Sequence, residues 1–594
     1  MTMSRILTPR SLSGRSWQLR DAAERMVQAL AQEYDLADSV ARILAARGFD
    51  KESAGPFLTP KLRDQMPDPS VFLDMDKAAD RMAHAVMRDE KICIFGDYDV
   101  DGATSGAVLS RYLGMVGLKA RNYIPDRLEE GYGPNAEAMR KLAGEGMGLC
   151  VTVDCGTTAF APLEAAQQAG MDVIILDHHA AEAALPPAHA VVNPNRLDET
   201  SGHRNLAAVG VTFLFVVALN RALRQRGFFA IRKEPDLMAL LDLVALGTVA
   251  DVVSLTGLNR VFVAQGLEVM ARRGNVGLAA LMDVAGLKER PQAWHCGFFL
   301  GPRVNAGGRV GRSDLGTILL TTDNSAEARN LATELDRMNA ERRAIEQMIT
   351  DEALIQAEKQ AEGGRKVLIV AEEAWHPGVI GIVASRIKER FNLPAIVIGS
   401  HKGKWTGSGR SVKGVDLGAA VIAARQAGLL TKGGGHQMAA GVSLVPDRLP
   451  DFMSFMDERI SRDLDSAGGL PPIDCDAVIS TGGATAQLVS QFERLAPFGS
   501  GNPEPRVMVR DVRVGFAKPV GGEGLHVSCQ LQGTDGQRLK AIAFRAAGQP
   551  QGQALLEGKN RQFHVLGSLK LDNWQGKATP SLQIEDVAEA VSSV

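Results

Sequence analysis

Short apolar runs alternate with amphipathic stretches between residues 91 and 179, and this alternation predicts a parallel β-sheet. Strands are expected at KICIFGD, KARNYIP, LCVTVDCG and MDVIILDHH. Helices are expected between them, at TSGAVLSRYLGMVG, PNAEAMRKLAGEG and TAFAPLEAAQQAG. Continuous apolar strands that alternate with helices are typical of a parallel sheet covered on both faces. Residues 76–324 are therefore predicted to form an α/β domain, mostly helical from 207 to 285.

A helical repeat of apolar residues predicts one long connecting helix over residues 325–362. The repeat consists of Leu331, Leu335, Met338, Ile345, Met348, Ile349 and Leu354. No proline or glycine interrupts it before Gly363, and at ~1.5 Å per residue it could join two domains about 50 Å apart. A smaller α/β unit is predicted at 363–466, with strand KVLIV, helix GVIGIVASRIKERF and strand PAIVIG.

The two ends of the chain have different patterns. After the linker SAGGLPP, the runs RVMVRDVRV, LHVSCQL, LKAIAF, FHVLGSLKL and LQIEDV are separated by Gly, Asp and Asn. Five strands in about 90 residues fit a small barrel, so 473–594 is predicted to be an OB-like domain. Residues 1–75 are predicted to form a helical lead-in, broken near its end by prolines.

Composition excludes few classes of protein. With 594 residues, 45% hydrophobic and 23% charged, the chain resembles soluble globular proteins of several domains. No apolar run reaches the ~18–20 residues of a membrane span, and six scattered cysteines without a CxxC pair favour a cytoplasmic protein. The first twenty residues, with four arginines and no acid, could be a transit peptide, but Trp17 favours the start of a domain. A net charge of −3 neither indicates nor excludes nucleic-acid binding.

Acidic residues gather where the apolar runs end. CIFGDYDVDGATS places Asp97, Asp99 and Asp101 at every second position, and Gly102 permits a tight turn there. Each carboxylate raises the cost of ionising its neighbours unless a cation lies between them. A helix cap would explain one such Asp better than three. Further candidates end or interrupt other apolar runs: Asp154, Asp177, His178, His179 and Asp251.

These clusters are expected to meet, because open α/β sheets bind ligands at the carboxyl ends of their strands. Alone, Asp154 is more often a turn or cap residue, and Asp251 could be a satisfied buried carboxylate. Together they indicate cations. Imidazole is a poor ligand for Mg²⁺ and a good one for Mn²⁺, and the number of ligands suggests two ions ~3.5–4 Å apart. Two cations would activate water for in-line attack on phosphorus, so no nucleophilic side chain is required.

In this order, DYDVDG, VDCG, LDHH and GTVADVV resemble the four motifs of the DHH phosphoesterase superfamily. Within it the chain is similar to the RecJ family of single-strand-specific 5′→3′ DNA exonucleases over nearly its whole length. The resemblance implies two cations, Mn²⁺ preferred or Mg²⁺, and release of 5′ mononucleotides in DNA repair and recombination. Relatives that have a histidine four residues before the first-motif Asp have a ligand that Phe95 replaces here.

The resemblance assigns a role to each motif residue. Asp99 and Asp101 would bind metal, and Asp97 would either bind metal or orient a ligand. Asp154 would bridge the ions, His178 would bind one of them, and Asp251 would close the site. Asp177 and His179 would orient or assist, with His179 contacting the scissile phosphate.

Phosphate binding is predicted in the smaller α/β unit. AWHPGVIGIVASR, GSGRS and GGGHQMAAG resemble the DHHA1 domain, which faces the metal site and holds substrate. Glycines beside Ser, Arg and His bring backbone N–H groups close to phosphate, although GGGH alone could be a turn. In relatives such groups, with a second clamp from GPRVNAGGR, bind the terminal 5′ phosphate. The candidates are Arg303, Asn305, Arg309, His376, Ser408, Arg410, Ser411, Gly434, Gly435 and His436.

The barrel is predicted to add a basic, aromatic platform for bases. Its candidates are Lys518, Arg538, Lys540, Arg545, Lys570, Trp574 and Lys577, whereas Phe544 is expected in the core and the lysines could simply be solvated. A phosphoesterase for short oligonucleotides, cyclic dinucleotides or pyrophosphate would not need this tail, and a non-catalytic replication scaffold would not need four intact motifs. We expect a monomer that acts on single-stranded DNA with a 5′ end, with a single-strand-binding protein and a helicase as candidate partners.

Overall fold

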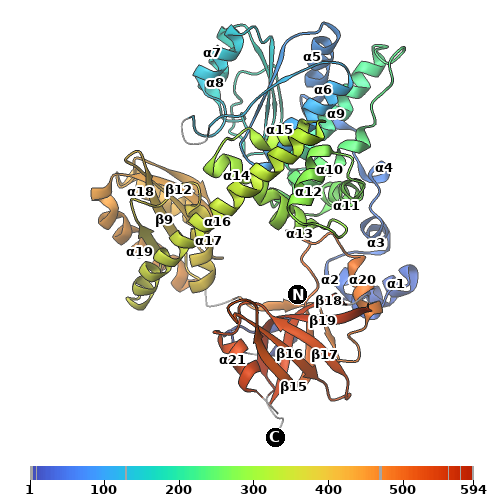
Figure 1. The fold of residues 1–594 in the computed structure, drawn as a ribbon, viewed down its shortest axis with the longest axis vertical. Helices are drawn as coiled ribbons and strands as arrows, with labels where there is room; N and C mark the ends of the chain where they lie inside the picture. Colours follow the sequence, from blue (N-terminus) through green and yellow to red (C-terminus); the bar gives the residue numbers. More distant parts are fainter. Residues whose placement is uncertain are drawn as a thin grey trace.

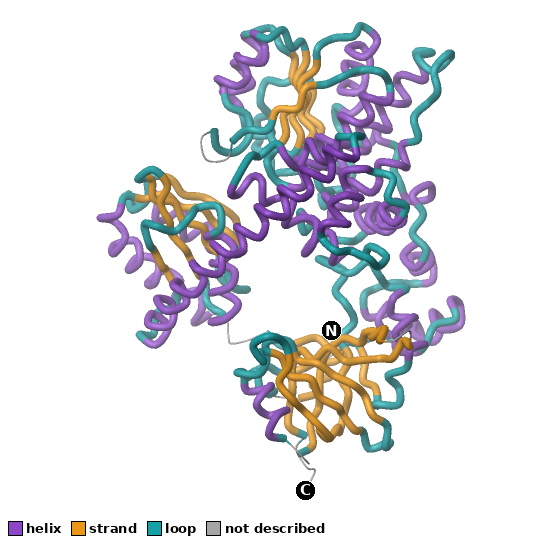
Figure 2. The backbone as a smooth tube through the Cα atoms, in the orientation of Figure 1, coloured by secondary structure: helices purple, strands orange, loops and turns teal. Residues whose placement is uncertain are grey.

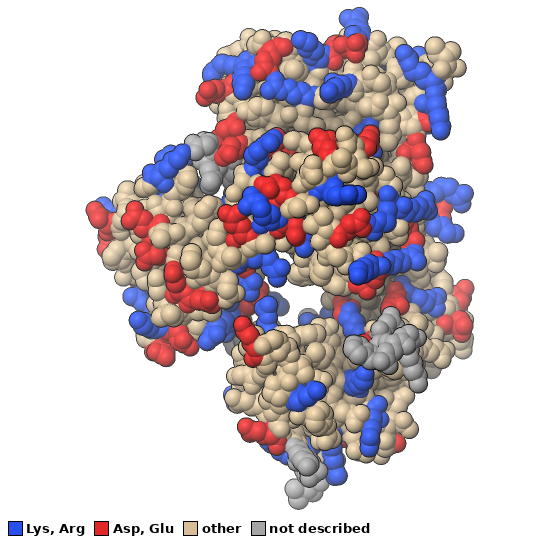
Figure 3. Space-filling model, in the orientation of Figure 1, with Lys and Arg blue, Asp and Glu red and all other residues tan. Residues whose placement is uncertain are grey.

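The computed structural model describes residues 5–8, 10–126, 130–466, 471–558, 561–574 and 577–590. Three units surround a central opening, with the larger α/β domain above, the smaller α/β unit at the left and a β-barrel below (Figure 1). Figure 2 shows that the strands are concentrated in these three places. The opening persists when all atoms are drawn, and Lys and Arg side chains border much of it (Figure 3).

The larger domain contains a five-stranded sheet in the order β4-β3-β5-β6-β7, with every pair parallel. The strands are β3 (Ile92–Gly96), β4 (Arg121–Tyr123), β5 (Leu149–Val153), β6 (Asp172–Leu176) and β7 (Ala190–Val192). One face packs against α5 (Met75–Met87), α6 (Val100–Met115) and α9 (Ala208–Gln225), and the other against α7 (Ala136–Gly144) and α8 (Phe160–Gln168). The predicted parallel sheet with two covered faces is confirmed.

Further helices extend this domain toward the opening. They are α10 (Leu241–Ala250), α11 (Gly257–Ala271), α12 (Val276–Val284), α13 (Ala293–His295), a π-helix (Cys296–Leu300), α14 (Gly301–Val310) and α15 (Leu315–Thr321). Among the described residues, α9 is the one helix that by length and composition could cross a membrane, although Asn220 and Arg221 interrupt its apolar run. That stretch is 78% buried and packs against α5, α6 and α10, as the core helix of a domain does.

The predicted connecting helix is present as α16 (Ser325–Glu362), capped by the Asn324 side chain. It packs on α12, α14 and α15 at one end and on α17 (Ile380–Phe391) and β8 (Leu368–Ala371) at the other. Buried Glu346 accepts hydrogen bonds from Arg342 at 2.5 Å within α16 and from Arg386 of α17 at 2.7 Å. The helix therefore joins the two α/β units by direct packing and by an ion-pair network.

The smaller unit has a mixed sheet in the order β11-β12-β10-β9-β8. Its remaining strands are β9 (Ala395–His401), β10 (Lys404–Arg410), β11 (Lys432–His436) and β12 (Ala439–Leu444), and its remaining helices are α18 (Leu417–Gln426) and α19 (Leu449–Ser466). Only β8 and β9 are parallel; β9–β10, β10–β12 and β11–β12 are antiparallel.

The C-terminal strands close into a five-stranded barrel, as predicted. They are β15 (Val507–Val520), β16 (His526–Gln532), β17 (Arg538–Ala543), β18 (Gln562–Trp574) and β19 (Lys577–Glu589), with α21 (Pro550–Glu557) between the third and fourth. Closure follows from the pairings β15–β16, β16–β17, β17–β19, β19–β18 and β18–β15.

The N-terminal segment folds together with the C-terminal region. Its strands β1 (Arg5–Thr8) and β2 (Trp17–Leu19) form a three-stranded sheet with β13 (Ile473–Cys475), in the order β1-β2-β13. Four helices follow: α1 (Glu24–Tyr34), α2 (Asp38–Ala46), α3 (Lys51–Leu58) and α4 (Leu62–Gln65). Leu30 and Leu44 share one apolar core with Leu531 of the barrel. The buried Trp17 indole donates to Asp586 Oδ2 at 2.9 Å. Both ends of the chain thus build one module.

Candidate metal centre

Three acids lie directly after strands of the parallel sheet. Asp97 follows β3, Asp154 follows β5 and Asp177 follows β6, and all three are buried. After Asp97 the chain turns into α6, where Asp99 caps the helix by accepting from Gly102 N–H at 3.0 Å. A Cβ at Gly102 would lie 2.5 Å from Asp97 O, so this turn needs glycine because of close backbone approach. The predicted meeting of acids at one sheet edge is therefore built by strand ends and one tight turn.

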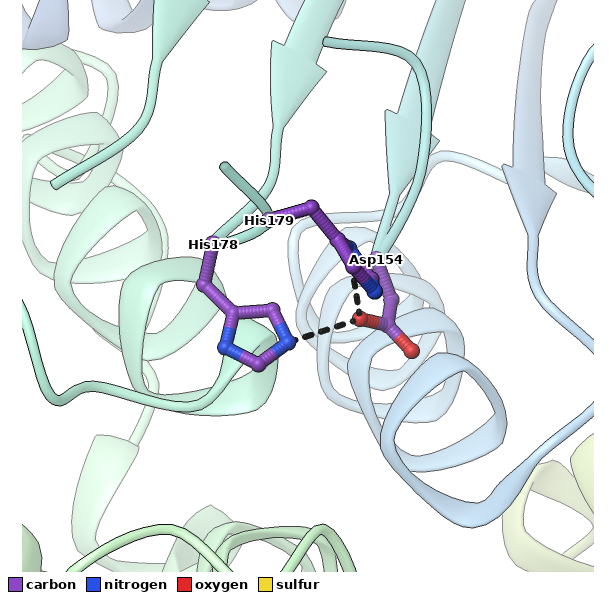
Figure 4. A group of neighbouring side chains, drawn as sticks. All are labelled: Asp154, His178 and His179. Atoms are coloured by element: carbon purple, nitrogen blue, oxygen red, sulfur yellow. Dashed lines mark ion pairs between the residues drawn. The ribbon is translucent and has the colours of Figure 1, made fainter. Parts of the chain in front are cut away.

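The acids and histidines form three overlapping groups whose ligand atoms lie within 4.8 Å of one another. The groups are Asp97–Asp99–Asp154, Asp101–His178–Asp251 and Asp154–His178–His179. Asp154 and His178 each belong to two groups, and Figure 4 shows both histidines pointing at the Asp154 carboxylate. Residues from four separate motifs thus supply neighbouring places where a cation would fit, and Asp154 and His178 link the three groups.

The His178 ring is oriented for metal binding. Its Nδ1 lies 3.0 Å from Leu206 O, so Nδ1 carries the proton and donates to that carbonyl. Nε2 then presents its lone pair to the acids, 3.3 Å from Asp154 Oδ1, 3.7 Å from Asp251 Oδ2 and 3.8 Å from Asp101 Oδ2. A backbone carbonyl that fixes the tautomer is the usual support of a metal-binding histidine.

The carboxylates are costly to ionise without a cation. Burial raises the pKa of Asp101 to about 6, although its oxygens accept from Ala208 N–H at 2.7 Å and Val209 N–H at 2.8 Å. Burial and repulsion by Asp101 and Asp99 raise the pKa of Asp251 to about 8 and that of Asp154 well above its usual range. Asp154 Oδ1 is buried and accepts no hydrogen bond from any described residue. This donor set fits divalent ions, which would replace the protons.

Asp177 and His179 form an ion pair beside the groups. Asp177 Oδ1 accepts from His179 Nδ1–H at 2.8 Å, and Oδ2 accepts from Thr157 N–H at 3.1 Å. Burial alone would raise the pKa of Asp177, but these bonds outweigh it and lower that pKa. Burial alone would lower the pKa of His179, but Asp177 raises it to about 9. Asp177 therefore favours the protonated form of His179, whose half-exposed ring lies 3.8 Å from Asp154 Oδ1.

Sequence reasoning missed three residues that hold the two histidines. Asn195 Nδ2 donates to His178 O at 2.5 Å, and Asn193 Nδ2 donates to His179 O at 2.9 Å. The Tyr132 hydroxyl donates to Asp154 O at 3.2 Å and lies 3.3 Å from the His179 ring nitrogens. A signal for the asparagines was present, because the run AVVNPN places them at the end of β7, on the same sheet edge.

Comparison with known proteins identifies the family. Family models match at 91–248 (DHH family, N-terminal domain), 364–462 (DHHA1 domain) and 475–586 (RecJ OB domain). "Single-stranded-DNA-specific exonuclease RecJ" of Bacillus subtilis is 35% identical over 96% of this chain and 70% of its own length. The Escherichia coli protein of the same name is 37% identical over 86% of this chain and 89% of its own. The chain belongs to the RecJ family of single-stranded-DNA-specific exonucleases.

Solved RecJ structures agree with this assignment. Thermus thermophilus RecJ in complex with Mn²⁺ matches with a TM-score of 0.80 at 28% identity, covering 97% of this chain and 80% of that chain. Its complex with Mg²⁺ matches with a TM-score of 0.75 at 26% identity, covering 97% and 79%. The resemblance inferred from four motifs is confirmed, and this RecJ-family chain is a metal-dependent hydrolase, not a scaffold.

Four of the predicted phosphate-binding residues gather where α14 meets the smaller unit. Gly308 of α14 lies against the first motif, where a Cβ would be 2.9 Å from Tyr98 O. The next residue, Arg309, donates to Gly378 O at 2.9 Å, and His376 Nδ1 accepts from Gly378 N–H at 3.0 Å. At the start of α17, the site of Gly381 adjoins Ser408 and Arg410, which hydrogen-bond to each other at 3.1 Å. The cluster thus connects the first motif to the DHHA1 unit of this RecJ-family chain.

The glycine-rich strand β11 is aligned with this cluster. Across β10, β12 and β11, Ser408 is in register with Gly434, and Arg410 is in register with the exposed His436. Gly435 lies between Gly434 and His436 on β11, which is the edge strand of the sheet. The strand order therefore extends the cluster across the sheet by about 10 Å.

Other predicted residues have partners that hold the scaffold. Arg303 donates to Asp336 Oδ1 and Phe299 O, both at 2.8 Å. Ser411 is buried and donates to Val415 O at 2.9 Å. Asn305 lies one helical turn before Arg309, on the same side of α14.

The outer face of the barrel carries exposed aromatic rings. The expectation that Phe544 is a core residue was wrong, since its side chain is 50% exposed. Its ring packs against the His526 ring, with 5.2 Å between the two ring centroids. Leu539, Ala541 and Ala543 point inward, so the strand alternation turns Phe544 outward. Phe516 is 59% exposed and is in register with Gln530 and Lys540 on the same face. The side chains of Trp574 and Lys577 lie outside the described residues.

Proposed function

We propose that this RecJ-family chain removes mononucleotides from the 5′ end of single-stranded DNA by hydrolysis at two adjacent cation sites. The observation that carries this proposal is the sharing of Asp154 between two ligand groups. Asp97 and Asp99 would complete one site with Asp154. Asp101, His178 and Asp251 would form the other, which Asp154 adjoins because its Oδ1 lies 3.3 Å from His178 Nε2. The imidazole favours Mn²⁺ over Mg²⁺. Bound divalent ions supply Lewis acidity, which lowers the pKa of water and stabilises the leaving 3′ oxygen.

The Asp177–His179 pair would assist at the phosphate. Asp177 holds His179 by the 2.8 Å hydrogen bond and keeps it protonated. The half-exposed imidazolium then lies at the edge of the cation groups, where it can donate to a non-bridging oxygen of the scissile phosphate. Leu206 O fixes His178, so this ring serves as a ligand and does not move protons.

The cluster beside α17 would anchor the terminal 5′ phosphate. Burial lowers the pKa of Arg410, and among the described residues no carboxylate pairs with it. Arg309, His376 and Ser408 add donors close to the start of α17, and a helix start attracts anions. Gly434, Gly435 and His436 would extend the pocket along β11, while Asn305 lies beside Arg309 on α14. An anchor that accepts only a terminal phosphate next to the metal site favours 5′ polarity.

Two positions would support this anchor indirectly. Arg303 fixes α14 to α16 through Asp336, and Ser411 fixes the chain after β10 through Val415 O. The outer barrel face, with Phe516 and Phe544 exposed among Lys518 and Lys540, would stack bases of the incoming strand. We also propose that the domains have the boundaries predicted from the sequence, from the lead-in at 1–75 to the barrel at 473–594.

End-labelled substrates test the proposal. Long single strands labelled at either end are digested with Mn²⁺, alongside dinucleotides and 5′-hydroxyl strands. We expect 5′ label to appear first as mononucleotide, while 3′ label remains in a shrinking ladder. Asp101→Ala and His178→Ala should each abolish hydrolysis. Earlier release of the 3′ label would contradict the polarity, and activity in both variants would contradict the metal assignment.

We also propose a monomer that works in the cytoplasm with a single-strand-binding protein and a helicase. The six cysteines are all unpaired and buried, which suits a reducing compartment. A helicase would supply the single strands that this enzyme class degrades. Sedimentation of the purified protein with and without each partner tests these points.

A further inference from the structure

A loop of the C-terminal module contacts the catalytic domain just after the candidate ligand Asp251. This loop, residues 495–503, is called the docking loop and precedes β15. Leu255 N–H donates to Ser500 O at 2.7 Å. A Cβ at Gly501, whose φ is +70°, would lie 1.8 Å from Ser254 Oγ. The Ser254 side chain fills the space that a side chain at residue 501 would need, so this contact requires glycine.

The docking loop is held rigidly from both sides. Asn502 is 2% exposed and its Nδ2 donates to Leu495 O at 2.9 Å and Pro497 O at 2.8 Å. Arg260 of α11, also 2% exposed, donates to Leu495 O at 2.9 Å and Ala496 O at 2.7 Å. It also donates to Phe57 O of α3 at 3.1 Å. A buried cation surrounded by carbonyl oxygens therefore ties the loop to the catalytic domain and to the N-terminal helices.

On the catalytic side, the contact fixes a strained segment. Asp251 ends α10, and the next residue, Val252, has φ +63°. A β-branched residue with positive φ is an outlier that persists only where its surroundings impose it. The docking loop contacts Ser254 and Leu255, which lie two and three residues after Val252. This contact therefore helps to define where α10 ends and where the Asp251 carboxylate lies.

The same segment is connected to the His178 support. Asn259 is fully buried and its Nδ2 donates to Ser254 O at 3.0 Å and Asn205 O at 2.5 Å. The residue after Asn205 is Leu206, whose carbonyl accepts from His178 Nδ1–H. One small frame thus links Ser254, Asn205 and Leu206, and it supports two of the three residues in the group Asp101–His178–Asp251.

We infer that the docking loop is a positioning element for this cation group. By fixing residues 254–255, it holds Asp251 at the distance from His178 that one cation requires. The C-terminal module then sets the cation affinity of the catalytic domain, independently of any contact with DNA. The inference rests on the metal assignment of the proposed function.

A Gly501→Ala variant of the full chain tests the inference through Mn²⁺ binding without DNA, followed by electron paramagnetic resonance of the free ion. The methyl group would push Ser254 away, so we expect affinity at one of two sites to fall at least about tenfold, with the other unchanged. kcat should fall at low Mn²⁺ and recover at saturating Mn²⁺, with KM for DNA unchanged. Gly536→Ala is the matched control, since Gly536 has φ +75° and a methyl group added there would meet no atom within 4 Å.

Two further variants separate misfolding from mispositioning. Ser254→Gly removes the atoms that the methyl group meets, so Gly501→Ala combined with Ser254→Gly should regain Mn²⁺ affinity. Gly499→Ala is milder, because its methyl would meet the end of the flexible Leu255 side chain, at 2.7 Å from Cδ1. We expect it to weaken the same site by a smaller factor, and it decides the matter if Gly501→Ala does not fold.

Asp251→Asn distinguishes the two possible failures. If this variant binds two Mn²⁺ ions as the unaltered protein does, the metal assignment itself is wrong. If Asp251→Asn loses one ion while folded Gly501→Ala and Gly499→Ala bind both with unaltered affinity, the positioning role of the docking loop is overturned.

Discussion

Removing the divalent ions should make the protein less stable as the pH rises. In the metal-free fold the pKa of Asp251 is raised to about 8 and that of Asp101 to about 6, against 3.8 for an unperturbed Asp. The folded state therefore keeps protons that the unfolded state has released. The contribution of these two carboxyl groups to the free energy of unfolding is fully present below pH about 4. It is lost as the pH rises through these pKa values, at ~1.4 kcal/mol per pH unit for each proton. His179, with a pKa of about 9, acts in the same direction above pH ~6.5.

The effect is easiest to measure between pH 6 and 8, where Asp251 alone should contribute on the order of 2–3 kcal/mol. For a domain of this size that corresponds to a loss of roughly 5–10 °C in Tm. Thermal unfolding followed by circular dichroism, in chelator and in Mn²⁺ at a series of pH values, measures it. With cations bound the carboxylates are ionised in the folded state, so the gap between the two Tm values should widen as the pH rises.

Two variants make the measurement specific. Asp251→Asn cannot ionise, so it should flatten the metal-free curve between pH 6 and 8. Asp323→Asn alters an exposed carboxylate paired with Arg111 and should leave the curve unchanged. A metal-free Tm that stays constant or rises over this range would refute the idea that these acids share a desolvated cation site.

Three further predictions concern single functions of the chain. Asp154→Asn removes the carboxylate shared by two of the three ligand groups and should lower kcat at least about 100-fold in Mn²⁺-dependent nucleotide release, which unaltered kcat would contradict. Arg410→Gln should reduce the preference for 5′-phosphorylated over 5′-hydroxyl strands by about 10- to 100-fold, measured as a ratio of kcat/KM, whereas Lys432→Gln on exposed β11 should not. Phe516→Ala and Phe544→Ala should each weaken the binding of long single strands by ~1–3 kcal/mol, measured by fluorescence anisotropy, and leave dinucleotide hydrolysis unchanged. An equal loss in both assays would contradict the proposal that these rings stack bases of the incoming strand.

The metal centre could be predicted because its residues obey a rule of topology. Asp97, Asp154 and Asp177 each end an apolar strand, and parallel strands bring their carboxyl ends to one edge. Asn193 follows the same rule, but β7 has only three residues and its apolar run is too short to stand out. Local pattern therefore locates the edge, and the length of each strand decides which residues can be recognised.

Phe544 shows where the pattern is insufficient. Hydrophobicity favours burial of a Phe next to alanines, yet alternation along β17 places Ala541 and Ala543 inside and Phe544 outside. Size does not decide the matter, because the ring of Phe563 on β18 is fully buried in the same core. Register decided the outcome, and register depends on pairing partners distant in the sequence.

The contacts of Arg260 could not be predicted, because its partners lie about 200 residues away in both directions along the chain. They also change how a deletion of the barrel would be interpreted. Removing 473–594 would expose the apolar faces of α1 and α2, which share a core with the barrel. It would also leave the buried Arg260 cation without the Leu495 and Ala496 carbonyls that solvate it. Loss of activity in such a truncation would therefore combine lost DNA contact, a destabilised N-terminal segment and a displaced Asp251. Single substitutions at Phe516 and at Gly501 separate the first of these effects from the third.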